Sequence, residues 1–513
     1  MSLIEYLDKG ASIDSERPCL VTDGEVLTYA DVQDLSFRVA RALTASGVRT
    51  GDKVAILSSN DPLAFASVFG ISRAGAVWCP INPRNEAAEN QQLLDLFDCT
   101  CLIFQSTYAP MVEKIAADLP TLTTYICLDS TTTLGVDFAS WLAAAPSDTN
   151  LGATTTPECT VMLVGTGGTT GAPKGVELSA ANIDTMTALT LMSYPFEDAP
   201  VYLAMAPLTH AAGVLCFPIM THGGRIVIMR QPDVPQFLSL VESHCVTHTF
   251  LPPTLIYVAL TDPAAPTTDY SSLQCFWYGA APISPTRLSE AIDTFGPVMA
   301  QLFGQSEAPM MISTMAPRDH FDASGAKSLS RFASAGHPTP LTTVAIMAKD
   351  GTLLPLGETG EIVVRGPLVM TGYYKNPDAT AEASQFGWHH TGDIGYLDED
   401  NFLFIVDRAK DMIITGGFNV YSVEVEQALM KHPAILEAAV VGLPDDKWGE
   451  RVVAVVQPAD GADVNVAEVT AHMKELIGSV KTPKNIHVWD DLPRSKVGKV
   501  LKTDIRVTLL KSS

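Results

Sequence analysis

The chain has 513 residues, of which 47% are hydrophobic and 18% are charged. Because a single hydrophobic core stops growing at roughly 250–300 residues, we expect two or more domains. The 33 Lys and Arg residues against 57 Asp and Glu residues give a net charge of −24, which argues against nonspecific binding to nucleic acid or to anionic lipid.

The first residues of the chain do not resemble a secretory signal, because acidic side chains stand where a basic flank and an apolar run are needed. The most apolar stretch, residues 63–81, is interrupted by Ser67, Ser72 and Arg73, so it is a poor membrane span. The nine cysteines are scattered without a CxxC pair, which favours small buried side chains in a reduced compartment over a disulfide framework or a zinc site. We therefore expect a cytoplasmic protein without a transmembrane segment.

Short apolar runs alternate with helical stretches over the first 400 residues. Residues 53–57 and 77–79 are expected strands, and residues 62–74 between them are an expected helix. Further strands are expected at 101–104, 124–128, 161–164, 225–229, 247–251 and 273–277. Buried strands separated by helices are typical of parallel sheets with helices on their faces.

From about residue 343 the pattern changes to hairpins. Asp350-Gly351 lies between apolar runs at 344–347 and 353–354, and residues 398–401 lie between two more. This predicts a smaller β-rich unit. Charge marks a further boundary, since residues 411–513 carry 12 Lys and Arg against 14 Asp and Glu, whereas the other 410 residues carry 21 against 43.

A loop of glycine and threonine follows the expected strand at 161–164, with the sequence Gly165-Thr-Gly-Gly-Thr-Thr-Gly-Ala-Pro-Lys-Gly175. Its unobstructed backbone N–H groups, its hydroxyls and Lys174 suit a polyphosphate, although a loop of this composition is also compatible with a plain surface loop. Two residues separate Gly171 from Lys174, where a Walker loop needs Gly-Lys-Ser/Thr, and Thr170 stands where a dinucleotide fingerprint needs glycine. Both common nucleotide motifs are therefore disfavoured.

This loop closely resembles the phosphate-binding signature of adenylate-forming enzymes, the superfamily of acyl-CoA synthetases, luciferases and peptide-synthetase adenylation domains. The usual signature has Ser or Thr where this chain has Gly167. Seven further signatures follow in the expected order: Pro207-Leu-Thr-His210, Tyr278-Gly-Ala-Ala-Pro282, Phe303-Gly-Gln-Ser-Glu307, Thr391-Gly-Asp393, Asp407-Arg-Ala-Lys-Asp411, Gly416-Gly-Phe-Asn419 and Gly498-Lys499.

The resemblance implies a fold of two parts. Residues 1–408 would form a large α/β adenylation domain of parallel-rich sheets with a β-rich subdomain, and residues 409–513 a small, mobile α+β lid that turns on Lys410. Such enzymes use Mg·ATP to convert a carboxylic acid into an acyl-adenylate, after which the thiol of coenzyme A displaces AMP. The implied partners are therefore a small carboxylic acid, ATP and CoA, and a homodimer is compatible with the sequence.

The nucleotide site carried over by resemblance comprises Thr166, Gly167, Gly168, Thr169, Thr170, Gly171, Lys174, Gly279, Ala280, Ala281, Phe303, Gly304, Gln305, Ser306, Asp393, Arg408 and Lys499. Glu307 would hold Mg²⁺, Asp393 and Arg408 would hold the ribose, and Lys499, with Lys174 and His210, would be catalytic. On the residues alone, Glu307 could be a surface side chain, Asp393 a turn residue and Lys499 a solvated lysine. Lys496 and Lys502 are expected to be solvated, or partners of the CoA phosphates.

The acyl pocket is expected from residues 204–217, 249–254 and 278–281, which contain His210, Gly213, Thr254, Tyr278 and Gly279. These segments hold no Asp, Glu, Lys or Arg, whereas an α-amino acid needs a carboxylate for its ammonium group, so we expect an apolar fatty or aromatic acid. His210 would act as a gate, or else be a turn histidine. Gly416 and Gly417 would line the thiol tunnel. The alternatives are a carrier-protein thiol as acceptor and a non-catalytic nucleotide or acyl sensor.

Overall fold

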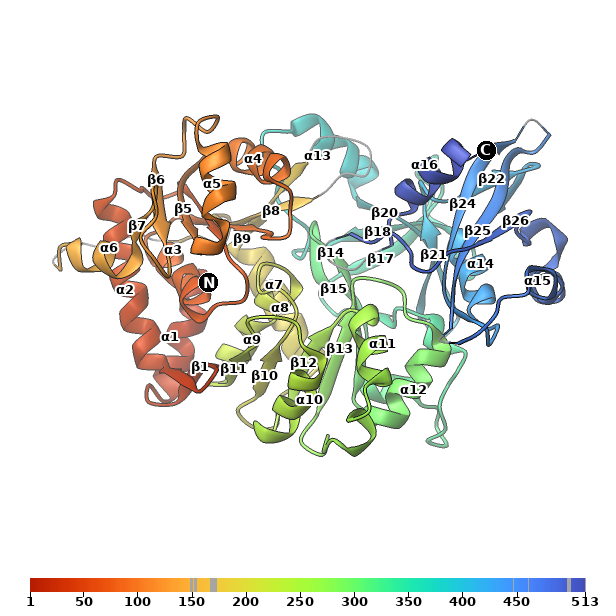
Figure 1. The fold of residues 1–513 in the computed structure, drawn as a ribbon, viewed down its shortest axis with the longest axis horizontal. Coiled ribbons are helices and arrows are strands. Elements are labelled where there is room, and N and C mark those ends of the chain that lie inside the picture. The colour runs from red at the N-terminus through yellow and green to blue at the C-terminus, as the bar shows by residue number, and fades with distance from the viewer. Residues whose placement is uncertain are drawn as a thin grey trace.

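The computed structural model describes residues 1–147, 151, 155–166, 173–445, 447–459, 461–495 and 500–512. Within these residues the strands form four sheets with helices packed against them (Figure 1). Three of the sheets are built by residues up to Arg408 and the fourth by residues that follow it. This arrangement confirms the predicted α/β class with a large N-terminal part and a small C-terminal part.

The first sheet has the strand order β19-β9-β8-β4-β3-β5-β6-β7. Its centre is parallel, as expected for strands separated by helices. Helix α3 begins where it does because Asp61 accepts the backbone N–H groups of Leu63 and Ala64, and Pro62 occupies the first turn. The strands are β3 (Lys53–Leu57), β4 (Val77–Ile81), β5 (Cys99–Phe104), β6 (Thr124–Cys127), β7 (Val136–Asp137), β8 (Thr160–Thr166), β9 (Lys174–Ser179) and β19 (Gly372–Tyr373).

The second sheet has the order β16-β15-β14-β13-β12-β10-β11-β1-β2. It is parallel from β1 to β14 and antiparallel at both edges. The strands are β1 (Pro18–Thr22), β2 (Glu25–Thr28), β10 (Val201–Ala204), β11 (Arg225–Ile228), β12 (His248–Leu251), β13 (Cys275–Gly279), β14 (Met299–Gln305), β15 (Ala308–Met315) and β16 (His337–Pro338).

Helices accompany both sheets and bury their apolar faces against them. Their bounds are α1 (Leu3–Ile13), α2 (Tyr29–Ala45), α3 (Pro62–Arg73), α4 (Ala87–Leu96), α5 (Ala109–Ala116), α6 (Phe138–Ala144), α7 (Ala180–Ser193), α8 (Ala211–Val214), α9 (Cys216–Met220), α10 (Val234–Ser243), α11 (Pro253–Thr261), α12 (Pro285–Phe295) and α13 (Pro377–Ala383).

The third sheet is the β-rich unit, an antiparallel array of β17 (Thr343–Met347), β18 (Gly360–Arg365), β20 (His389–Leu397) and β21 (Leu403–Arg408). The hairpin expected around Asp350-Gly351 is only partly right. Leu353 makes a single bridge to Met347, and the main partner of β17 is β18. The reason is burial, because Leu353 is exposed whereas Ile362, Val363 and Val364 of β18 are fully buried.

The fourth sheet joins β23-β22-β25-β24, with β26 beside β25, and has hydrophobic clusters of its own (Figure 1, blue). Its elements are β22 (Ile413–Thr415), β23 (Phe418–Val420), α14 (Ser422–Leu429), β24 (Ile435–Asp445), β25 (Gly449–Pro458), α15 (Val466–Lys481), β26 (Asn485–Val488) and α16 (Lys502–Ser512). We call these elements the C-terminal unit.

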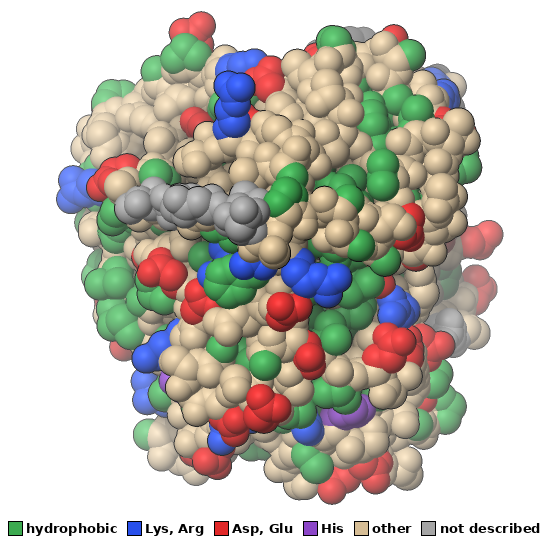
Figure 2. Space-filling view, turned by 90° about the vertical axis from the view of Figure 1, so that its left-hand side faces the viewer, with side chains coloured by type: hydrophobic (Ala, Val, Ile, Leu, Met, Phe, Trp, Pro, Cys, Tyr) green, Lys and Arg blue, Asp and Glu red, His purple; other side chains and the backbone are tan. Residues whose placement is uncertain are grey.

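The molecular surface in Figure 2 mixes acidic and basic side chains and gathers no broad patch of lysine and arginine on this face. Such a surface fits the strongly negative net charge and gives a polyanion no extended site here. None of the helices in the described ranges is long and apolar enough to cross a membrane.

Candidate functional site

The sequence motifs meet where strands of the three N-terminal sheets end. Side-chain contacts link Lys174 to Tyr373, Tyr373 to Glu307, Gln305 to Thr391, and Asp393 to Arg408. Thr166 and Lys174 stand opposite each other on the antiparallel strands β8 and β9. Six of the expected nucleotide-site residues lie outside the described residues, namely Gly167, Gly168, Thr169, Thr170, Gly171 and Lys499.

Asp393 and Arg408, the expected ribose ligands, are cross-strand neighbours on β20 and β21. Arg408 Nε lies 2.8 Å from Asp393 Oδ1, and the aspartate is buried whereas the arginine side chain is 49% exposed. Gln305 connects this pair to the next motif, because its Nε2 donates to Thr391 O at 3.1 Å and its Oε1 accepts from His389 Nε2 at 3.0 Å. A buried carboxylate beside a solvent-reaching cation can accept charge-assisted hydrogen bonds from sugar hydroxyls.

Glu307, the expected metal ligand, is half-buried and is held from two sides. Tyr373 Oη donates to Glu307 Oε1 at 2.8 Å, and the backbone N–H of Met370 donates to the Glu307 carbonyl at 2.7 Å. Burial, followed by the charge of Glu307, raises the pKa of Tyr373, so the phenol stays protonated and donates. Lys174 Nζ lies 4.7 Å from the centre of the Tyr373 ring.

A single carboxylate fits Mg²⁺ better than it fits a transition metal. No group of three or more His, Cys, Asp or Glu side chains suited to a metal ion occurs in the described part of the chain. Mg²⁺ keeps several water molecules and is commonly held by one or two carboxylates together with substrate phosphates. Glu307 therefore fits a metal that arrives with a nucleotide.

Gly279 and Ala280 end β13 at a point where the backbone is tightly constrained. A Cβ on Gly279 would lie 2.3 Å from the carbonyl oxygen of Leu302 on the adjacent strand β14, so no side chain fits there. Ala280 adopts a φ of +66°, a left-handed conformation that is strained for a residue with a Cβ. Gly279 is buried whereas Ala280 is exposed, and the strain at Ala280 is a feature that the sequence motif did not reveal.

The residues expected in the acyl pocket differ in their surroundings. His210 precedes α8 and its Nδ1 lies 2.9 Å from Thr209 Oγ1. A Cβ on Gly213 would lie 1.9 Å from a backbone oxygen of the preceding turn, and Thr254 is half-buried in α11. The ring of Tyr278 is fully buried in the core, with its hydroxyl 3.0 Å from the Nε2 atom of a buried histidine, so only its backbone borders the strand end.

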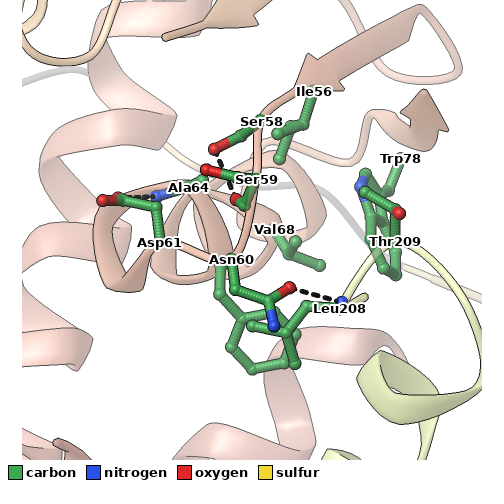
Figure 3. Close-up of a pocket in the computed structure, with 11 residues that line it drawn as sticks. Ile56, Ser58, Ser59, Asn60, Asp61, Ala64, Val68, Trp78, Leu208 and Thr209 are labelled. Atoms are coloured by element: carbon green, nitrogen blue, oxygen red, sulfur yellow. Dashed lines mark hydrogen bonds between the residues drawn. The ribbon is translucent and has the colours of Figure 1, made fainter. Parts of the chain in front are cut away.

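Asn60, which the sequence analysis did not single out, fixes the turn that carries His210. Its Oδ1 accepts the backbone N–H of Leu208 at 2.8 Å (Figure 3). Its Nδ2 donates to the carbonyl of Ala206 at 3.1 Å. A small cavity of about 20 Å³ lies beside this turn, enough for one water-sized group. It is lined by Ile56, Ser58, Ser59, Asn60, Asp61, Ala64, Phe65, Val68, Trp78, Leu208 and Thr209. Asn60 directly follows β3 and two serines, a signal of polar residues at a parallel strand end that could have revealed it.

The two glycines of the expected thiol tunnel have different structural reasons. Gly416 and Gly417 form the turn between β22 and β23, with φ values of +57° and +83°. A Cβ on Gly416 would lie 2.8 Å from the Trp448 ring, whereas a Cβ on Gly417 would meet nothing within 4 Å. Gly417 therefore has open space beside it. Lys410, the expected hinge, is exposed in the turn that joins β21 to β22.

A buried ionic cluster joins β21 to the C-terminal unit. Asp407 of β21 accepts hydrogen bonds from the backbone N–H and the hydroxyl of Ser422 at the start of α14. Lys502, the first residue of α16, donates to the Ser422 hydroxyl and lies 2.7 Å from Glu426 Oε1. Burial raises the pKa of Asp407 and of Glu426, and it would lower that of Lys502, which the two carboxylates instead raise.

Lys502 is therefore not the solvated lysine that the sequence suggested. Its side chain is only 19% exposed because it neutralises Glu426 and Asp407. Its partners lie about 80 residues or more away along the chain, so local sequence gives no signal for this pairing.

Family models match both parts of the chain. The AMP-binding enzyme model matches residues 7–374, and the AMP-binding enzyme C-terminal domain model matches residues 424–499. These matches confirm the resemblance to adenylate-forming enzymes that the motifs predicted. The boundary at residue 409 lies between the two matched ranges.

Individual relatives match over nearly the whole chain. A medium/long-chain-fatty-acid–CoA ligase of Mycobacterium tuberculosis is 36% identical over 96% of this chain and 87% of its own length. The structure of an amide bond synthetase from Marinactinospora thermotolerans superposes with a TM-score of 0.90, 29% identity and 99% of both chains covered. That of an o-succinylbenzoate CoA synthetase from Bacillus subtilis, solved with its acyl-adenylate intermediate, gives a TM-score of 0.86 at 28% identity, covering 98% of this chain and 97% of the other.

Replacing Lys502 tests the buried cluster. Lys502→Met should lower the free energy of unfolding of the C-terminal unit by about 3–5 kcal/mol at pH 7, because two buried carboxylates lose their cation. Hydrogen exchange of peptides from β24 and β25 would measure this free energy. Lys511 is an exposed lysine of the same helix, so Lys511→Met should change the free energy of unfolding by less than about 0.5 kcal/mol.

The same variant should respond to pH with a definite sign. A carboxyl group whose pKa is raised by folding, such as that of Asp407 or Glu426, binds more protons in the folded than in the unfolded state. The free energy of unfolding therefore falls as the pH rises from the unfolded pKa of the group to its folded pKa. Lys502→Met should therefore regain stability between pH 7 and pH 5. Equal exchange rates for Lys502→Met and Lys511→Met at pH 7 would contradict the cluster's role.

Proposed function

Since this chain belongs to the AMP-binding enzymes and matches acid–CoA ligases of that family over nearly its whole length, we propose that it is an ATP-dependent carboxylate–CoA ligase acting on an apolar acid. The observation that carries the proposal is the set of contacts that joins Lys174, Glu307, Asp393 and Arg408. One nucleotide could touch all of them at once. A nucleotide sensor would not need a metal carboxylate among these groups.

In the first half-reaction, an oxygen of the acid attacks the α-phosphorus of ATP, and the bond from that phosphorus to the bridging oxygen breaks, releasing pyrophosphate. Asp393 and Arg408 hold the ribose, Lys174 holds phosphate oxygens, and Glu307 holds the metal. Mg²⁺ would supply charge neutralisation on the polyphosphate. Lys499 would stabilise the charge that develops between the carboxylate and the α-phosphate.

In the second half-reaction, the CoA thiol attacks the acyl carbonyl, loses its proton, and the bond to the AMP oxygen breaks. We assign residues 1–408 and 409–513 as the two moving parts, with Lys410 as the hinge. Asp407 precedes this hinge whereas Ser422 and Lys502 follow it, so a rotation at Lys410 separates the ionic cluster. The rotation would bring Gly416 and Gly417 to the acyl-adenylate.

The acid is proposed to be fatty or aromatic. The acyl segments contain no Asp, Glu, Lys or Arg side chain that could pair with a charged group on the acid. Of the three relatives named above, one is a fatty-acid–CoA ligase and another is an o-succinylbenzoate CoA synthetase, whose acid carries an aromatic ring. The similarity to an amide bond synthetase makes an amine the second candidate acceptor in place of CoA, and a carrier-protein thiol is a third.

A screen of carboxylic acids by ATP–pyrophosphate exchange tests which class of acid the protein activates. Fatty and aromatic acids should be activated with much higher kcat/KM than α-amino acids, because the pocket lacks a carboxylate for the ammonium group. A hydrophobic pocket distinguishes one methylene by only about 1–3 kcal/mol, so several related acids should react. An α-amino acid as the best substrate would overturn the pocket assignment. If CoA stimulates AMP release when no carrier protein and no amine is added, CoA is the acceptor.

A pair of variants separates the two half-reactions. Lys499→Ala should slow acyl-adenylate formation by about 10²–10³-fold, the usual effect of losing one preorganised charge donor, while the conversion of supplied acyl-adenylate with CoA falls much less. Gly417→Leu should retain adenylation and block thioester formation, since the space beside Gly417 is open only while that residue has no side chain.

Two controls accompany this pair. Gly417→Ala introduces the same strain at a φ of +83° with little bulk, so it should block thioester formation far less than Gly417→Leu. Lys511→Ala removes an exposed lysine from the same terminal segment and should leave both half-reactions unchanged. Equal loss of both half-reactions in Lys499→Ala and Gly417→Leu would rule out a lid with two working positions.

A further inference from the structure

Tyr373 lies between the two groups that would act on the ATP phosphates, yet none of the recognised motifs contains it. Its hydroxyl donates to Glu307 Oε1 at 2.8 Å, and its ring centre lies 4.7 Å from Lys174 Nζ. One side chain thus contacts both the carboxylate that would hold the metal and the lysine that would hold phosphate. These groups are 66 residues and about 200 residues away in sequence from Tyr373.

The backbone of Tyr373 is rigidly placed. Tyr373 forms β19, which pairs antiparallel with β9 just after Lys174, with Tyr373 opposite Val176. Its own N–H donates to Thr380 Oγ1 at 2.9 Å, and the next N–H, of Tyr374, donates to Gly175 O at 2.8 Å. Since the Met370 N–H also holds the Glu307 carbonyl, the segment from 370 to 374 connects the two sides of the site.

We propose that Tyr373 is a positioning residue, whose hydroxyl orients Glu307 toward a nucleotide-bound Mg²⁺ and whose ring aligns Lys174 with the same phosphates. The inference rests on the proposed function. By donating to one carboxylate oxygen, the phenol restricts the rotamer of Glu307 and would leave the other oxygen available to a metal ion. By offering its π face to an ammonium group, the ring limits the directions that Lys174 can take.

A residue that orients a metal ligand without binding the metal itself has an effect on metal affinity of known magnitude. Loss of a group that orients a metal ligand typically weakens metal binding by about 10–100-fold. Loss of an exposed cation–π contact weakens binding by about two- to fivefold. The two roles of Tyr373 can therefore be separated by removing only the hydroxyl or the whole ring.

The neighbouring Tyr374 offers a matched control. Its hydroxyl donates to Asp98 Oδ2 at 2.9 Å, so Tyr373 and Tyr374 each make one phenol–carboxylate hydrogen bond from the same short segment. Asp98 also pairs with Lys375 and belongs to none of the motifs. Tyr374→Phe therefore removes the same atom and the same kind of bond without touching the phosphate site.

The test is a titration of the full-length protein with Mn²⁺, followed by electron paramagnetic resonance in the presence of a non-hydrolysable ATP analogue. Tyr373→Phe should weaken Mn²⁺ binding by about 10–100-fold, approaching Glu307→Gln, while Tyr374→Phe should bind Mn²⁺ as the unaltered protein does. Tyr373→Leu should in addition weaken metal-free binding of the analogue by about two- to fivefold, whereas Tyr373→Phe should not. Thermal melting without nucleotide checks that each variant is folded.

The outcomes are distinguishable. Unchanged Mn²⁺ affinity in Tyr373→Phe would overturn the inference alone, as would an equal loss in Tyr373→Phe and Tyr374→Phe. Failure of the unaltered protein to bind Mn²⁺ with the analogue would overturn both the proposed function and the inference. If Tyr373→Phe melted early, Mn²⁺ binding would be measured below its melting temperature, where a loss of affinity supports the inference and an unchanged affinity overturns it.

Discussion

The orientation of the C-terminal unit depends on one carboxylate that has been taken out of water, that of Asp407. Moving an ionised carboxylate into a protein interior costs several kcal/mol unless partners compensate it. Here part of the compensation comes from the backbone N–H of Arg408, and the rest comes from the C-terminal unit through the Ser422 N–H, the Ser422 hydroxyl and the charge of Lys502. Any other orientation of that unit must either hydrate Asp407 or supply new donors to it.

Strand β21 also carries Arg408, one of the two residues proposed to hold the ribose. Arg408 directly follows Asp407, its N–H donates to Asp407 Oδ1 at 2.7 Å, and its side chain pairs with Asp393. Successive side chains of a strand point to opposite faces, so β21 presents Asp407 to the C-terminal unit on one face and Arg408 to Asp393 on the other. Under the proposed function, a change at the ribose and a change in the orientation of the C-terminal unit would act on one short piece of backbone, which would be a physical route for coupling the two.

The sequence predicted most of the fold and the motif residues, and failed where distant residues meet. Helix α3 was predictable because Asp61 and Pro62 form a local start signal, and the central strands because they are continuous apolar runs. The roles of Asn60, Tyr373 and Lys502 were not predicted, because each depends on a partner brought close only by the fold. The hairpin at 350 forms, but the longer pairing of β17 with β18 was not predicted, because turn chemistry marks where a chain bends, not which later strand is buried enough to pair.

Backbone contacts also limit how this site can choose its acid. Carbonyl oxygens lie 1.9 Å and 2.3 Å from where a Cβ would stand on Gly213 and Gly279, so neither position can carry a side chain without moving the backbone. The side chain of Tyr278 is also fixed, since its hydroxyl forms a hydrogen bond inside the core. Under the proposed function, the size and polarity of the acid would then be set by other side chains of the acyl segments, such as His210 and Thr254, and by how firmly Asn60 holds the turn before His210. The adenylating chemistry would rest on fixed backbone and paired charges, and the choice of acid on the few side chains around them.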